Sequence, residues 1–311
     1  MPASLTNAPP NLDRAAVHPD LPPLREAVTR GDWPAVAAFF DRTADPDDRE
    51  YAVALISDVA GSEAFLGHAD STLGRTLYGR RLIVAGWEIR SSRLAKDISR
   101  EQFEAFHDHL RHAERLLIEL TAEDPGNAAA WVGRLMTVRG LELGQNEARR
   151  RYDQLSRHVP HHFPAQGQLI QQLCPKWSGS HEKTHSFAVE CMRAAPGGSR
   201  APLAVLDAHM ERFLDIEKAR EATAYLQSPE VVSEIEEAAD RSVRHPDFRP
   251  GFYSVETHNR FALLFCLIDR GPSAAAHFRA VGNLATESYW DRFGDPADVF
   301  SKYRRIVLKK G

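Results

Sequence analysis

The chain has 311 residues, of which 43% are hydrophobic and 26% are charged, a composition too apolar for a generally disordered chain. Its net charge of −4 at pH 7 gives no overall attraction to nucleic acid or to an anionic membrane surface. Three scattered cysteines, an odd number, argue against a disulfide framework and predict a reducing, cytoplasmic location.

The first twenty residues are polar and contain four prolines, so we expect residues 1–20 to form a disordered tail. They carry neither a basic cluster nor an apolar core, and we expect no secretory signal. The longest apolar run, Phe261 to Ile268, has eight residues. A membrane helix needs about 20 such residues, so the sequence predicts no membrane contact.

From residue 21 onward, apolar residues recur at helical spacing, and Gly, Pro and capping residues mark the breaks. The clearest helix spans 99–121, where Ser99 and Gln102 form a capping box before one apolar stripe. No alternating β-branched run of strand length occurs between turns. The predicted fold is all-α, with one helical-repeat domain over 21–306 and a basic tail at 307–311. The expected helices are 22–30, 33–40, 48–60, 72–90, 99–121, 127–140, 145–158, 162–173, 180–194, 201–225, 229–243, 253–268, 272–282 and 286–306.

Helix-stop signals recur at nearly equal spacing in the middle of the chain. Pro125, Pro160 and Pro196 are separated by 35 and 36 residues, the period of a helical hairpin repeat. Trp131 is followed by Ala148 and Tyr152 at offsets of 17 and 21 residues. These offsets fit the tetratricopeptide pattern with one inserted residue. We therefore expect antiparallel hairpins stacked as a degenerate tetratricopeptide-like α-solenoid, with Trp131 in the core.

Three segments resemble a known family. They are residues 82–90, the long helix leading to Asp124-Pro125, and the turn Pro175-Lys176-Trp177-Ser178-Gly179-Ser180. Together they resemble an uncharacterised bacterial family of tetratricopeptide-like proteins that is classed as a domain of unknown function. The family's turn reads Pro-Lys-Trp-Gly-Gly-Ser, so Ser178 stands in place of its first glycine. The resemblance covers about residues 40–270 and implies a helical repeat fold, without a reaction, cofactor or catalytic residue.

A helical repeat presents one face of the first helix of each pair in a concave groove, and the first hypothesis is a non-enzymatic protein that binds a protein or peptide there. A second candidate surface is the unusually long turn from Lys176 to Glu182. An acidic partner side chain could dock at the following helix N-terminus while Trp177 supplies apolar contact. Alternatively, Trp177 folds inward between neighbouring hairpins and Ser180 is an ordinary cap. The residues expected at these surfaces are Ala129, Val132, Met136, Arg139 and Gln171 in the groove, and Lys176, Trp177, Ser180, His181 and Glu182 in the turn.

The alternative hypothesis is a zinc hydrolase centred on His181-Glu182-Lys183-Thr184-His185, a formal H-E-x-x-H. Two features weaken it: the motif begins a helix directly after a Gly-Ser cap, and no third ligand is evident nearby. A solvated helix start is the simpler interpretation of these histidines. The sequence contains no nucleotide-binding or nucleophile-elbow signature, so we expect no cofactor. The basic C-terminus lacks the interleaved aromatic residues of a nucleic-acid site, and we expect no nucleic-acid partner.

Overall fold

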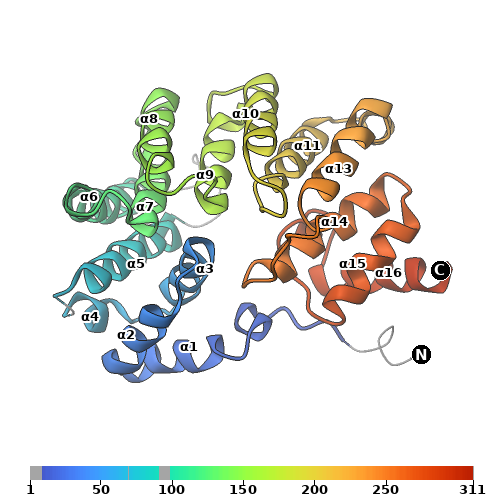
Figure 1. Ribbon diagram of the computed structural model, residues 1–311. Helices are drawn as coiled ribbons and strands as arrows, with labels where there is room; N and C mark the ends of the chain where they lie inside the picture. The colour runs from blue at the N-terminus through green and yellow to red at the C-terminus, as the bar shows by residue number, and fades with distance from the viewer. Residues whose placement is uncertain (1–8, 69, 91–98, 311) are drawn as a thin grey trace. The chain divides into compact units, whose positions relative to one another are not determined.

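Helices make up most of the computed structural model, which describes residues 9–68, 70–90 and 99–310 (Figure 1). In these residues, strand-like pairing is limited to an isolated bridge between Asn11 and Leu284. The predicted all-α class is confirmed. Across the described ranges, no helix combines the length and the hydropathy required to cross a membrane.

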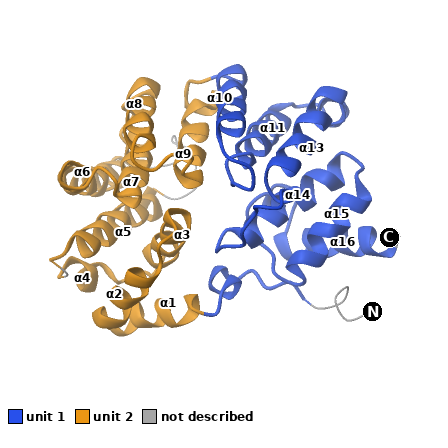
Figure 2. Cartoon of the chain, in the orientation of Figure 1, with its two compact units in different colours: residues 1–19, 180–311 blue, residues 20–179 orange. Residues whose placement is uncertain are grey.

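The chain packs as two compact units, which Figure 2 shows in different colours. One, the 20–179 unit, ends in the turn that follows Leu173. The other, the 180–311 unit, also includes the residues that precede Asp20. The sequence pattern had predicted one domain over 21–306. The 20–179 unit contains α1 (Leu21–Arg30), α2 (Trp33–Arg42), α3 (Pro46–Ser57), α4 (Glu63–Gly67), α5 (Thr72–Arg90), α6 (Arg100–Glu123), α7 (Ala128–Gly140), α8 (Gln145–Ser156), α9 (Phe163–Leu173) and the 3-10 helix η3 (Pro175–Trp177).

The helices of the 180–311 unit follow the same pattern of short connections. Helices that are neighbours along the chain pack on one another in both units, for example α5 on α6, α10 (His181–Ala194) on α11 (Leu203–Asp215) and α14 (Ser254–Leu267) on α15 (Gly271–Val281). The structure therefore has the solenoid-like succession of helical hairpins that the sequence predicted. The 180–311 unit contains η1 (Arg14–Val17), α10 (His181–Ala194), α11 (Leu203–Asp215), α12 (Ala219–Leu226), α13 (Pro229–Arg241), α14 (Ser254–Leu267), α15 (Gly271–Val281), η4 (Trp290–Arg292) and α16 (Pro296–Lys310).

Helix α6 is central to the core of the 20–179 unit. Its capping box is present: the Ser99 hydroxyl accepts from the Gln102 backbone N–H, and the Gln102 side chain accepts from the Ser99 N–H. The predicted stripe faces inward, with Phe106 2% exposed and Leu110 and Leu117 fully buried. They form one cluster with residues of α5 and α7. The 3.6-residue periodicity thus identified both the helix and its buried face.

The repeat positions that the proline spacing indicated are packing positions. Trp131, Ala148 and Tyr152 are all buried, as expected for the residues that join the two helices of a hairpin. The Trp131 indole N–H donates to the Pro125 carbonyl at 2.9 Å, which satisfies the polar atom of the buried ring. The prediction that Trp131 belongs to the core is confirmed.

The predicted disordered tail is wrong for residues 9–20, while residues 1–8 lie outside the described part of the chain. The Asn11 N–H donates to the Asn283 carbonyl at 2.7 Å, and the Ala285 N–H donates to the Asn11 carbonyl at 3.0 Å. Ala15 in η1 is fully buried. Backbone pairing does not depend on side-chain hydropathy, so a polar composition did not reveal that this segment packs on the 180–311 unit.

Deleting residues 1–18 is accordingly expected to lower the melting temperature by about 5 °C or more, since it removes a packed helix and two backbone hydrogen bonds. Deleting only residues 1–8 is the matched control. Thermal unfolding followed by circular dichroism measures both. A shift of less than about 2 °C for the longer deletion would show that the docked segment adds no stability.

Two further boundaries differ from the sequence prediction. The single helix expected over 201–225 is two helices, because the backbone becomes extended at Ile216, which ends α11. The helix expected over 286–306 begins only at Pro296, and it continues through the predicted basic tail to Lys310. Val307 is buried, and this apolar contact explains why the helix extends beyond residue 306.

Candidate functional site

The predicted groove residues on α7 are less accessible than the repeat register suggested. Helix α7 contacts α3, α5, α6, α8 and α9, so other helices surround it. Val132 is only 1% exposed, and the expectation that it lines an open groove is wrong. Ala129 and Met136 are partly buried, and Met136 packs against the core cluster around α6. Val132 therefore belongs to the packing of α7, whereas Arg139 in the last turn of this helix is only partly buried.

That end carries Arg139, which lies beside the unusual turn after α9. The Arg139 guanidinium lies 5.9 Å from the centroid of the Trp177 ring. Its Nη2 donates to Gln168 Oε1 at 2.9 Å, whereas its Nη1 is buried and without a hydrogen-bond partner. In the described ranges, no carboxylate forms an ion pair with Arg139. Burial lowers the pKa of Arg139 to about 10, so the side chain remains a cation at neutral pH.

The turn positions Trp177 through backbone hydrogen bonds. The carbonyl of Cys174 accepts from the N–H groups of Trp177 and Gly179, at 3.0 and 3.1 Å. Ser178 has φ of +66°, a left-handed conformation that favours glycine. Trp177 is partly buried, and Lys176 is exposed. Arg139 and Trp177 thus come together, with Gln171 partly buried on the neighbouring helix α9.

The N-terminus of α10 does not offer the free anion site that the sequence suggested. The Ser180 hydroxyl accepts from the Lys183 N–H at 3.2 Å, as an ordinary cap does. Glu182 already places a carboxylate there, and hydrogen bonds from its own backbone N–H and from Ser180 lower its pKa. An incoming acidic group would therefore meet a carboxylate in the first turn.

The two histidines of the H-E-x-x-H motif belong to two different groups of side chains, one with Asp215 and one with Glu234 and His209. His181 Nε2 lies 2.9 Å from Asp215 Oδ2, while His185 Nε2 lies 2.7 Å from Glu234 Oε2. The same oxygen of Glu234 is 2.8 Å from His209 Nε2. The alternative hypothesis paired the two motif histidines on one metal. In the structure, His181 and His185 contact different carboxylates, those of Asp215 and Glu234.

In the cluster around Glu234, burial and hydrogen bonding shift the pKa values of Glu234, His209 and Tyr225. Hydrogen bonds from His209 and His185 lower the pKa of Glu234 to about 2, so it is a carboxylate at neutral pH. Burial lowers the pKa of His209, which favours the neutral imidazole. Burial also raises the pKa of Tyr225 to about 12, and its hydroxyl lies 2.7 Å from His209 Nδ1. All four side chains belong to the 180–311 unit.

Sequence reasoning missed His209, Glu234 and Tyr225. Glu234 is one of several acidic residues on α13, a pattern that is typical of a solvated helix face. A signal was present for His209, which lies within the apolar run of α11 and is 2% exposed. A histidine on a buried helix face needs a polar partner, but the sequence did not say which residue supplies it.

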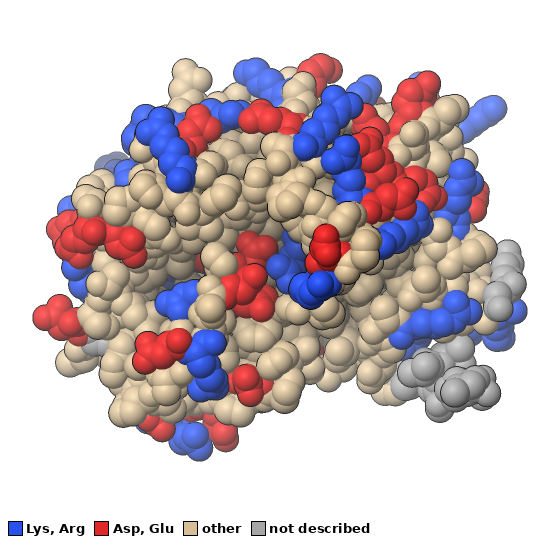
Figure 3. Space-filling view, viewed as in Figure 1, with Lys and Arg blue, Asp and Glu red and all other residues tan. Residues whose placement is uncertain are grey.

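On the face that Figure 3 shows, acidic and basic side chains are intermixed. This agrees with the small net charge of the chain. No protein-family model, curated protein or solved structure matches the chain.

Proposed function

We propose that the chain is a non-enzymatic helical-repeat protein that binds an acidic segment of a protein or peptide partner at Arg139 and Trp177. The observation that carries the proposal is the partly buried Arg139 cation, which has a buried Nη1 without a partner. We assign to the partner a carboxylate that pairs with this guanidinium, and an apolar group that packs on Trp177.

A buried charge is costly unless it is paired, and most buried arginines in proteins have a carboxylate partner. Here desolvation is the main influence on the Arg139 pKa, and it acts against the charged form. A carboxylate from a partner would offset that cost and accept a second, charge-assisted hydrogen bond. Arginine and tryptophan are also the residue types enriched at the energetic centres of interfaces. Lys176, exposed in the same turn, adds a second positive charge for an acidic segment.

The proposal is tested with an immobilised library of ten-residue peptides that carry Asp and Glu, and with a matched library in which Asn and Gln replace them. The intact chain is expected to bind members of the acidic library and to lose binding as salt is raised, because the contact is ionic. Arg139→Gln should weaken binding by about tenfold or more, which corresponds to one lost charged hydrogen bond. Equal binding to both libraries would refute the proposal.

Arg111→Gln is the matched control, because Arg111 is exposed on α6 and paired with Asp108. It should leave peptide binding unchanged. Arg139→Gln should also change the free energy of unfolding by less than about 1 kcal/mol. The substitution loses one hydrogen bond, but it also removes the cost of burying a cation, and the two effects oppose each other. A large loss of stability in Arg139→Gln would instead assign this arginine a structural role.

We further propose that the chain belongs to the tetratricopeptide-like family that its motifs resemble, and that it acts in the cytoplasm. The buried repeat residues Trp131, Ala148 and Tyr152 support the first part. The left-handed Ser178 supports it as well, since a glycine of the family's turn would adopt that conformation without strain. Cys174, Cys191 and Cys266 are not joined in disulfides, which is compatible with a reducing compartment.

A further inference from the structure

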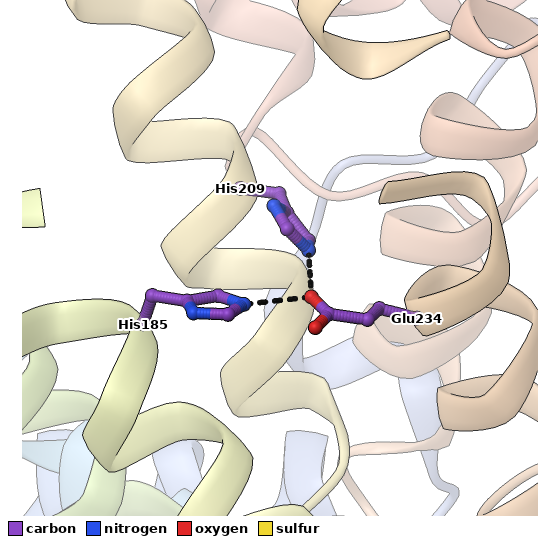
Figure 4. Close-up of side chains that lie close together, drawn as sticks. All are labelled: His185, His209 and Glu234. Atoms are coloured by element: carbon purple, nitrogen blue, oxygen red, sulfur yellow. Dashed lines mark hydrogen bonds and ion pairs between the residues drawn. The ribbon is translucent and has the colours of Figure 1, made fainter. Parts of the chain in front are cut away.

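Three side chains with metal-binding atoms converge in the 180–311 unit, far along the sequence from Arg139. Figure 4 shows His185 and His209 pointing their rings at the carboxylate of Glu234. The three ligand atoms all lie within 4.8 Å of one another. The residues are 24 and 25 positions apart in sequence, so the cluster is a product of the tertiary fold.

Each of the three side chains comes from a different helix. His185 is in the second turn of α10, His209 is in the middle of α11, and Glu234 is in the second turn of α13. Helix α11 packs on both α10 and α13. Ligands on packed helices are held more firmly than ligands on loops.

The spacing of the ligand atoms is close to that of a metal site. Zn²⁺ bonds to nitrogen and oxygen at about 2.0–2.1 Å, which puts the ligand atoms of a tetrahedral site about 3.3 Å apart. The nitrogens of His185 and His209 lie 2.7 and 2.8 Å from Glu234 Oε2. An ion would therefore need to push these atoms apart by about half an ångström. The side chains of His185 and Glu234 are 40% and 26% exposed, and they have room to move.

A neighbouring residue orients one ligand. The Tyr225 hydroxyl lies 2.7 Å from His209 Nδ1, the ring nitrogen that points away from Glu234. Metal-binding histidines usually donate this second N–H to an acceptor, which fixes the ring and its tautomer. The Arg212 guanidinium lies 4.7 Å from the centroid of the Tyr225 ring and holds the tyrosine in place. His209 thus has the supporting contact that a metal ligand needs.

We propose that His185, His209 and Glu234 bind a divalent transition-metal ion, and that Zn²⁺ suits this set of two imidazoles and one carboxylate. Three protein ligands leave a fourth coordination position for water. Solvent reaches this position past His185, whose side chain is 40% exposed. The ion ties α10, α11 and α13 together. This site is separate from the partner surface at Arg139, and neither proposal depends on the other.

Isothermal titration of the intact, chelator-treated protein with Zn²⁺ tests the site, with Co²⁺ absorption as a spectroscopic probe of the ligand set. One ion per chain is expected to bind, with a Kd of about 1 μM or tighter. His185→Ala and Glu234→Gln should each weaken binding by about 100-fold, and Tyr225→Phe by about tenfold. Circular dichroism verifies that each variant is folded, and His185→Ala is the substitution least expected to disturb the helices, because the His185 side chain is 40% exposed.

His181→Ala is the decisive control, because it destroys the H-E-x-x-H motif but leaves the three proposed ligands in place. It should change the affinity for Zn²⁺ by less than about twofold, as expected for a residue outside the site. Three results would each overturn the proposal: no stoichiometric Zn²⁺ binding by the wild-type chain, binding that Glu234→Gln does not weaken, or a loss in His181→Ala as large as that in His185→Ala.

Discussion

Replacing Phe106 by alanine is expected to lower the free energy of unfolding by about 3–5 kcal/mol. The ring is 2% exposed, and it contacts the Trp87 ring edge-to-face with a centroid distance of 4.8 Å. Its removal would leave a cavity in the cluster around α6, where helices on several sides limit collapse. Urea denaturation followed by circular dichroism measures the effect as a lower midpoint.

Ile118→Ala supplies the control on the same helix, because Ile118 is 45% exposed and faces away from the stripe. It should cost less than about 1 kcal/mol. Equal losses in the two variants would show that burial along α6 does not determine stability. A small loss in Phe106→Ala alone would show that the core can repack around the missing ring.

Gly179→Ala is expected to destabilise the chain by more than about 3 kcal/mol, because its methyl group would overlap the backbone. A Cβ at this position would lie 1.8 Å from the Leu173 carbonyl oxygen and 2.3 Å from the carbonyl carbon. Neither atom can turn aside as the end of a side chain can. The turn that carries Trp177 would have to open, so the variant should also lose binding of acidic peptides.

Two neighbouring substitutions test that explanation. Gly167 lies inside α9, and a Cβ added there would meet no atom within 4 Å, so Gly167→Ala should stabilise the chain by about 0.5–1 kcal/mol. Ser178→Gly removes the steric cost of a left-handed backbone conformation at a residue with a side chain. It should be neutral or stabilise the chain by up to about 1 kcal/mol. Thermal melts of the three variants should therefore rank Gly179→Ala far below the other two. A stable, binding-competent Gly179→Ala variant would contradict the close approach.

The Arg139–Trp177 pair and the cluster of His185, His209 and Glu234 show how far local sequence can predict a site. The sequence indicated Arg139 and Trp177 separately, one on a helix face and one in a turn. In the structure, the Arg139 guanidinium lies 5.9 Å from the centroid of the Trp177 ring. The histidines show the opposite. His181 and His185 belong to one motif in the sequence, but they contact different carboxylates in the structure. Helical spacing fixes which residues share a face, but it does not fix what packs against that face.

The sequence by itself determined the all-α class, the buried stripe of α6 and the repeat positions such as Trp131. These depend on periodicity, capping and proline spacing, which act within a few residues along the chain. Only the tertiary structure decided that Val132 is enclosed, that residues 9–19 are docked, and that His185 meets Glu234 rather than sharing a site with His181. Such contacts join residues that are tens or hundreds of positions apart, and packing between helices brings them together.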